Sequence, residues 1–97
     1  MEEIVATLGL VRMPGIPYER KKEILQGSES VASLFEGKEK TGEPRFRQKI
    51  GSFKGFRAIE EELAKLEKMD VRIVSIRDAV YPPQLKRIPD PPLALYL

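Results

Sequence analysis

The residues best suited to chemistry lie in the middle of the chain, where positive charge and aromatic rings occur together. Positions 38–57 hold seven basic residues and two acidic ones, a local excess of five positive charges in a chain whose net charge is +2. Lysine and arginine bind backbone phosphates, and aromatic rings offer surfaces on which bases stack. The candidate phosphate-binding residues are Arg45, Arg47, Lys49, Lys54 and Arg57, and the interleaved rings are Phe46, Phe53 and Phe56. The alternative is that the rings form core and the cations a solvated surface, since phenylalanine is usually buried.

A second candidate site is the turn at residues 13–17, which contains Pro14, Gly15 and Ile16. Two helices joined by a Pro-Gly-apolar turn resemble the helix-hairpin-helix motif, in which backbone N–H groups at a helix N-terminus approach a phosphate. Pro17 stands where that motif has a second glycine, so the turn has one donor fewer. A purely structural hairpin and a DNA contact are therefore both open.

Several kinds of chemistry are excluded by composition. The sequence contains no histidine and no cysteine, which excludes a disulfide framework, a zinc site of the Cys/His type and catalysis by histidine. The acidic run at 60–62 fits a solvated helix face, and Asp78 and Asp90 precede turn signals, where aspartate bonds to nearby backbone N–H groups. We therefore expect no enzyme, no catalytic residue, no metal ion and no cofactor.

The composition also bears on location. Charged residues make up 33% and hydrophobic residues 41% of the chain, which fits a small domain with a modest core. No apolar run approaches the roughly 20 residues that a membrane-spanning helix needs. The acidic start Met1-Glu2-Glu3 is unlike a signal peptide. We expect a cytoplasmic protein with no membrane partner.

Apolar residues recur at helical spacing in the first part of the chain. Residues 2–12 form one predicted helix, whose apolar face consists of Ile4, Val5, Leu8 and Val11. Pro17 opens a second helix at 18–26, and Ser28 caps a third at 29–36. Gly27 and Gly37 supply the left-handed residue after these two helices.

The basic segment leads into the longest predicted helix. Residues 44–52 fit a short helix, with Phe46 and Ile50 four positions apart. Residues 56–69 follow, and they carry a continuous apolar stripe of Phe56, Ile59, Leu63, Leu66 and Met69. This helix completes a helical domain that we predict over residues 1–69.

The chain changes character after residue 69. Residues 71–76 are rich in β-branched side chains and predict a strand. Five prolines between positions 82 and 92 then forbid a long helix or a central strand, and leave room for one helical turn from Gln84 to Arg87 or Ile88. Residues 93–97 are apolar and predict the beginning of a buried strand. We interpret residues 70–97 as the entrance to a further domain.

The C-terminal segment resembles the lead-in to the Rossmann-type domain of the DprA/Smf family (DNA-processing protein A). The family phrase is D-x-x-Y-P-x-x-L-x-x-I-x-D-P-P-x-x-L-Y. Its fixed positions are all matched, by Asp78, Tyr81, Pro82, Leu85, Ile88, Asp90, Pro91, Pro92, Leu95 and Tyr96. Nearer the start, the family's L-x-L-x-x-x-P-G-I segment is matched by Leu8, Leu10, Pro14, Gly15 and Ile16. The alternative for the tail is a generic proline-rich linker.

The resemblance implies a mainly α fold. A small SAM-like or helix-hairpin-helix domain would occupy residues 1–69, and a strand, a proline-rich turn and a second short strand at 70–97 would be the truncated start of a Rossmann-type domain. Members of the family bind single-stranded DNA and help to load the RecA recombinase during natural transformation in bacteria. Their main DNA pocket lies in the Rossmann-type domain, whose glycine-rich phosphate loop we expect after Leu97.

Two functions from different classes are compatible with these patterns. The first is an accessory nucleic-acid-binding domain of a DprA-like protein, acting through the basic segment. The second is a protein–protein or self-association module without DNA binding, because the strands at 71–76 and 93–97 would present unpaired edges that recruit partners or a second copy. A homodimer is possible under this second function.

Overall fold

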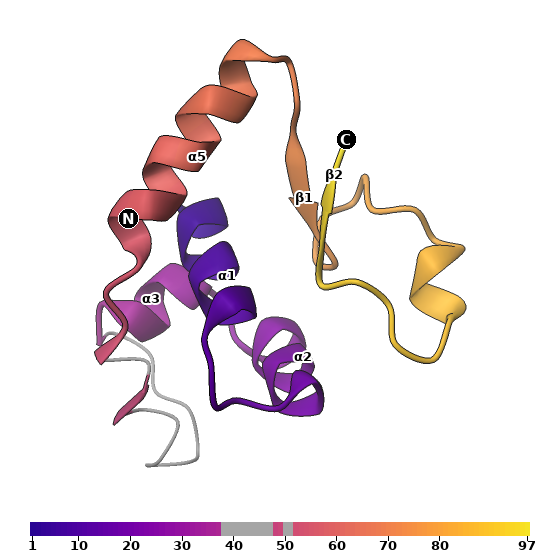
Figure 1. The fold of residues 1–97 in the computed structure, drawn as a ribbon. Helices are drawn as coiled ribbons and strands as arrows, with labels where there is room; N and C mark the ends of the chain where they lie inside the picture. The colour runs from indigo at the N-terminus through magenta and orange to yellow at the C-terminus, as the bar shows by residue number, and fades with distance from the viewer. Residues whose placement is uncertain (38–47, 50–51) are drawn as a thin grey trace.

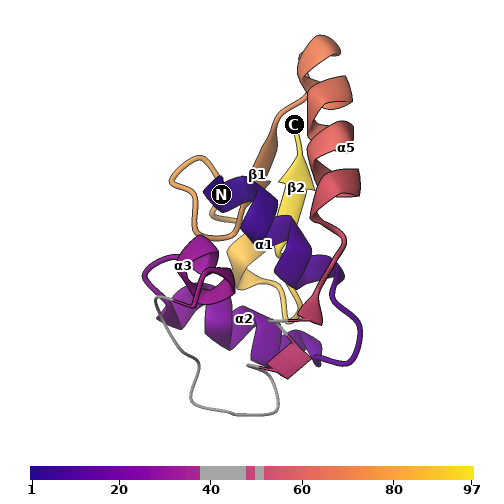
Figure 2. The same cartoon turned by 90° about the vertical axis from the view of Figure 1, so that its left-hand side faces the viewer.

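The computed structural model describes residues 1–37, 48–49 and 52–97. The elements of this part of the chain are α1 (Glu3–Arg12), α2 (Tyr18–Gly27), α3 (Val31–Phe35), α5 (Phe56–Lys68), β1 (Ile73–Ser75), a 3-10 turn (Leu85–Arg87) and β2 (Ala94–Tyr96). In both ribbon views α1 lies between α5 on one side and α2 and α3 on the other (Figure 1, Figure 2). The fold is mainly helical, as the sequence predicted, and its two short strands form one antiparallel sheet.

The central helix α1 is buried around its whole circumference. Ala6 and Leu10 have no exposed surface and join a core cluster with α2, α3, the sheet and the C-terminal segment. Val5 and Leu8 face the other way and form a second cluster with Ile59 of α5. The predicted single apolar face is therefore wrong for this helix, because Leu10 and the small or neutral residues Ala6, Thr7 and Gly9 are buried as well.

The junction between α2 and α3 differs from the prediction in its caps. Ser30, not Ser28, is the N-cap of α3, and its hydroxyl accepts a hydrogen bond from the Ser33 N–H at 3.2 Å. Ser28 instead follows the end of α2, which includes Gly27. Only the second of the two predicted left-handed glycines is confirmed, since Gly37 has φ +78° and Gly27 has no positive φ.

Glu3 explains why α3 begins where it does. Its carboxylate accepts hydrogen bonds from the backbone N–H groups of Val31 and Ala32, at 2.7 and 3.0 Å, and from the Ser30 hydroxyl at 2.8 Å. These are the donors that a helix leaves unsatisfied in its first turn. A side chain from the start of α1 thus caps α3 and joins the two helices.

Helix α5 has nearly the predicted bounds, but its apolar stripe is covered unevenly. Ile59 is 2% exposed against α1, Leu63 and Leu66 are half-buried, and Met69 at the far end is 68% exposed. The ribbon shows the same arrangement, because the end of α5 projects away from the other helices (Figure 1).

Both predicted strands are present in shorter form and pair with each other, but β2 is half-buried to exposed, so the prediction of a buried strand is wrong. The register places Ile73 opposite Tyr96, Val74 opposite Leu95 and Ser75 opposite Ala94. Further backbone bonds between residues 72 and 97 and between 76 and 93 extend the ladder at both ends. Val74 on one face packs into the cluster around Leu10, and Ile73 on the other face packs against the cluster around Ile59.

Two tyrosine hydroxyls hold the proline-rich passage against the rest of the chain. Tyr81 is 1% exposed and donates a hydrogen bond to the Pro92 carbonyl at 2.6 Å. Tyr18 of α2 donates to the carbonyl of the preceding residue, Pro91. The predicted helical turn between Tyr81 and Pro91 is confirmed as the 3-10 turn Leu85–Arg87. Residues on both sides of position 69 share one core cluster, and the division into two domains there stays a prediction.

Candidate nucleic-acid interface

The hairpin between α1 and α2 is anchored by its apolar residues. Met13 and Ile16 are 3% and 5% exposed in the main core, whereas Pro14 and Gly15 face outwards. Gly15 has φ +83°, a backbone conformation that glycine adopts without strain. Pro17 precedes the first residue of α2, and its carbonyl accepts hydrogen bonds from the N–H groups of residues 20 and 21, both at 3.0 Å.

A cation from the basic segment is bound to this hairpin. The ammonium of Lys49 donates to the Gly15 carbonyl at 2.8 Å, across a separation of 34 residues in the sequence. The lysine side chain occupies the space that a Cβ at Gly15 would need. Glycine at this position therefore serves two purposes, the left-handed turn and the close approach of a positive charge.

The hairpin and the basic segment together enclose a shallow hollow of about 320 Å³. The residues that line it are Met13, Pro14, Lys49, Ser52, Phe53 and Lys54. Ser52 donates from its hydroxyl to the Lys49 carbonyl at 3.0 Å, which links two of the lining residues. Lys54 is exposed at this hollow. The two sites that the sequence suggested separately thus meet in one place.

The remaining predicted cations divide into two groups. Arg57 does not line the hollow: it lies in the first turn of α5 with a side chain that is 93% exposed, and its Nε is 3.5 Å from Glu61 Oε1. Arg45 and Arg47 lie outside the described residues, as do Phe46 and most of the predicted helix at 44–52. Their part in a site stays a prediction.

The two described phenylalanines of the basic segment are packing residues. The ring of Phe56 meets those of Phe35 and Phe53 edge to face, with centroids 4.8 and 4.9 Å away. A Cβ added to Gly9 of α1 would lie 2.8 Å from the Phe56 ring, so the cluster sits directly on the helix backbone. This arrangement favours the core interpretation for both half-buried rings, although Phe53 also lines the hollow.

Lys21 makes a structural hydrogen bond that the sequence did not predict. Lys21 of α2 donates to the Val11 carbonyl at 2.6 Å and so satisfies an acceptor at the end of α1. Burial lowers the pKa of this ammonium. Only the hairpin fold brings the two residues together, because their sequence separation matches no helical spacing.

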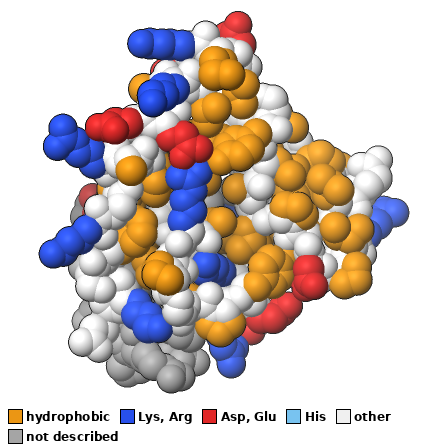
Figure 3. Space-filling model, in the orientation of Figure 1, with side chains coloured by type: hydrophobic (Ala, Val, Ile, Leu, Met, Phe, Trp, Pro, Cys, Tyr) orange, Lys and Arg blue, Asp and Glu red, His pale blue; other side chains and the backbone are white. Residues whose placement is uncertain are grey.

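The charge distribution on one face of the molecule is uneven. Blue side chains are scattered over α5 and the neighbouring part of the helical half, whereas orange side chains gather over the sheet and the proline-rich passage (Figure 3). Among the described residues, no cluster of three acidic side chains is arranged to hold a metal ion. None of the helices in this part of the chain has the length and apolar character needed to span a bilayer.

The class of protein that these features define is a mainly helical domain with a two-stranded antiparallel sheet and a lysine-bound hairpin. Comparison of the chain with protein-family models, with curated proteins and with solved structures finds no match. The resemblance to the DprA/Smf family consequently rests on the residues quoted above.

Proposed function

We propose that this chain is a cytoplasmic accessory domain of a DprA-like protein, which contributes contacts to single-stranded DNA while the parent protein helps to load the RecA recombinase. The observation that carries the proposal is the meeting of Lys49 and Lys54 with the hairpin at Pro14 and Gly15. A backbone phosphate lying over the hollow would face two ammonium groups, of which Lys49 is held in place by its bond to the hairpin.

The way in which the chain would bind DNA follows from the side chains that are exposed at the hollow. The rings of Phe53 and Phe56 pack against each other and against Gly9, and of the two only the half-buried Phe53 also lines the hollow, so base stacking is limited. Contacts to phosphates carry no sequence information and weaken steeply as salt rises. We therefore expect weak binding without sequence preference, with a steep dependence on salt.

The proposal is tested by the fluorescence anisotropy of labelled oligo(dT) titrated with the chain at low salt. The variant Lys54→Glu removes one cation at the hollow, and we expect binding to weaken and the salt slope to fall by roughly 0.7, the value for one phosphate contact on a single strand. Lys49→Gln should weaken binding too. The double variant Arg45→Glu/Arg47→Glu tests the predicted cations outside the described residues.

The matched control is Lys68→Glu, which makes the same charge change in the last turn of α5, away from the hollow. It should retain the parent affinity within a factor of about two, because distant exposed charges are screened. Equal losses in Lys54→Glu and Lys68→Glu would contradict a local site. Absence of any binding at high micromolar protein would contradict DNA binding by this chain altogether.

A second candidate function is self-association or binding of another protein. The observation in its favour is that Tyr96 and Leu97, at the end of β2, are 57% and 55% exposed. Strand edges and exposed apolar side chains of this kind recruit partners. Sedimentation equilibrium distinguishes the two: a concentration-dependent dimer that Leu97→Lys abolishes supports self-association, and a strict monomer counts against it.

A further inference from the structure

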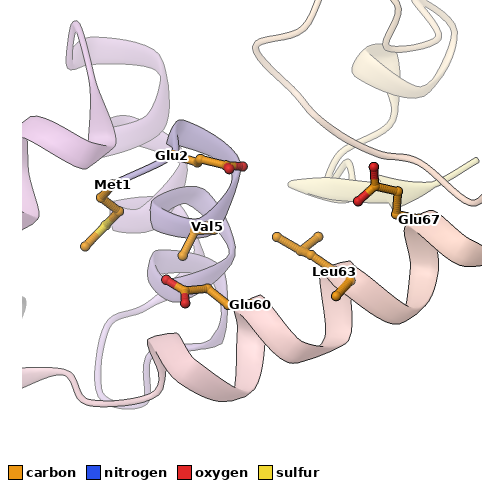
Figure 4. Close-up of a pocket in the computed structure, with 7 residues that line it drawn as sticks. Met1, Glu2, Val5, Glu60, Leu63 and Glu67 are labelled. Atoms are coloured by element: carbon orange, nitrogen blue, oxygen red, sulfur yellow. The ribbon is translucent and has the colours of Figure 1, made fainter.

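A second hollow, of about 470 Å³, lies on a different part of the surface, between the start of α1 and one face of α5. Its residues on α5 are Glu60, Leu63, Ala64 and Glu67, whose spacing places them on one side of the helix. Met1, Glu2 and Val5 line the opposite wall (Figure 4). We call this hollow the α1–α5 groove. It shares no residue with the hollow at the hairpin.

The floor of the α1–α5 groove is apolar. Val5 is 3% exposed beneath it, Leu63 is half-buried, and Ala64 and Met1 remain open to solvent. In the close-up, the Leu63 side chain points from α5 towards α1, with Val5 on the facing helix (Figure 4). The apolar stripe of α5 thus continues into the groove past the point where α1 covers it.

The rim of the groove is acidic, and its charges are not neutralised by neighbours. None of Glu2, Glu60 and Glu67 forms an ion pair with another residue in the described part of the chain. Five other glutamates there do have such a partner: Glu3, Glu23, Glu36, Glu61 and Glu62. The N-terminal ammonium belongs to Met1, which also lines the groove, and it lies 3.9 Å from the carboxylate of Glu36, a residue outside the lining. Unpaired negative charge is therefore concentrated around an apolar floor.

We propose that the α1–α5 groove binds a basic amphipathic helix of a partner protein. A groove between two helices accepts the apolar face of a third, and the rim charges select what flanks that face. Glu60 and Glu67 are seven residues apart, about 10 Å along the helix axis. An incoming helix with apolar residues at i, i+3 and i+4 would contact Leu63 and Ala64, and lysines or arginines one heptad apart would reach the two carboxylates.

This inference goes beyond the proposed DNA contact, since the groove repels phosphates and attracts cationic side chains. The occupant is assigned by charge complementarity: three unpaired carboxylates would lose solvation beneath an apolar or acidic partner, whereas a basic helix would pair with them. The two functions are independent, so failure of one leaves the other standing.

The test is an NMR titration of the isotope-labelled chain with a synthetic helical peptide. The probe is an acetylated, amidated Leu/Lys peptide of about 14 residues, roughly four turns, with leucines on one face and lysines on the others. The control peptide has the same composition in scrambled order. We expect shift changes at residues 1–5 and 60–67 with the ordered peptide, and much smaller changes with the scrambled one.

Three exposed substitutions give the decisive comparison. Glu67→Lys reverses a rim charge, and Ala64→Gln fills the floor without changing charge; each should weaken binding about tenfold or more. Glu19→Lys, the matched control on α2, should change it less than about twofold. Circular dichroism verifies that each variant is folded.

Three outcomes overturn the proposal. Equal weakening by Glu67→Lys and Glu19→Lys would show unspecific attraction to an acidic surface. Equal binding of the ordered and scrambled peptides would show that the apolar floor does not select a helix. Concentration-dependent self-association of the chain that Ala64→Gln abolishes would make a second copy the occupant.

Discussion

Arg12 on α1 and Glu62 on α5 form a two-bond ion pair, with Nη1 2.6 Å from Oε2 and Nη2 3.0 Å from Oε1. The hydroxyl of Tyr96 joins it, accepting from Arg12 Nη2 at 3.0 Å and donating to Glu62 Oε1 at 3.2 Å. One cluster of three side chains therefore ties the central helix, the longest helix and the last strand together. The Arg12 side chain lowers the pKa of Glu62, chiefly through these hydrogen bonds.

Glu62→Gln should lower the free energy of unfolding by about 1 kcal/mol, since it removes one charge from a bidentate pair whose side chains are about one-third exposed. Because the folded state depresses the pKa of Glu62, this contribution is present above the ordinary glutamate value and is lost as pH falls through the lowered one. Urea denaturation at neutral and acidic pH measures both. The control Glu61→Gln, at the more exposed pair with Arg57, should cost less than about 0.5 kcal/mol.

Gly9→Ala should destabilise the chain by about 1–3 kcal/mol, the usual cost of overpacking. The new Cβ would lie 2.8 Å from the Phe56 ring and 3.1 Å from the Phe53 ring, so the aromatic cluster must shift. Gly27→Ala is the matched control, because nothing lies within 4 Å of its Cβ and its φ is not positive. This variant should raise the free energy of unfolding by about 0.4–1 kcal/mol, because alanine lowers the conformational entropy of the unfolded chain. Thermal unfolding that shows the same sign for both would contradict the close approach at Gly9.

Glu3→Gln should cost about 1 kcal/mol, in the range for the loss of a helix cap. Burial alone would raise the pKa of Glu3, but hydrogen bonds from Ala32, Val31 and Ser30 and the charge of Arg77 outweigh it and lower the pKa. The cap therefore stabilises the fold above the ordinary glutamate pKa and fails as pH falls through the lowered value. Glu2→Gln, one residue earlier and without these partners, should leave acid stability nearly unchanged. Equal acid transitions in the two variants would refute the cap.

Tyr81→Phe should cost about 1 kcal/mol, since it keeps the buried ring and deletes only the hydrogen bond to Pro92. Burial raises the pKa of both Tyr81 and Tyr18, and nearby Asp90 raises that of Tyr18 further. A raised pKa means that stability falls as pH rises above the ordinary tyrosine value of about 10. The denaturation midpoint should fall less between neutral pH and a pH above about 10 for the double variant Tyr18→Phe/Tyr81→Phe than for the parent chain. An unchanged slope would contradict the anchoring of the proline-rich passage by these hydroxyls.

Most of the regular elements were predictable because their signals are local. The stripe of α5 and the prolines around the 3-10 turn act over a few residues, and both predictions are confirmed. Asp78 was predicted as a turn residue, and its carboxylate accepts a bond from the Ser75 N–H at 2.7 Å. The predicted single apolar face of α1 was wrong because Leu10 and the small residues Ala6 and Gly9 lie outside that face and are buried by neighbouring elements as well.

The candidate site was predictable only in part. The sequence identified the turn at Pro14 and Gly15 and the excess of cations, since both depend on composition alone. It gave no indication that Lys49 would reach the Gly15 carbonyl, because that contact joins residues 34 positions apart in the sequence. It also left the phenylalanines undecided between stacking and core; the packing on Gly9 favours core for Phe53 and Phe56, although Phe53 also lines the hollow.

The amino-acid sequence by itself determined where the chain bends and where it can form helices, because prolines, glycines and apolar spacing act on neighbouring residues. It also excluded chemistry that needs histidine or cysteine. Tertiary structure alone decided which of two serines caps α3, since Glu3 selects the second from 27 residues away. It likewise decided that the two strands pair with each other and that three glutamates border an open groove, because such contacts join residues whose separation no local pattern encodes.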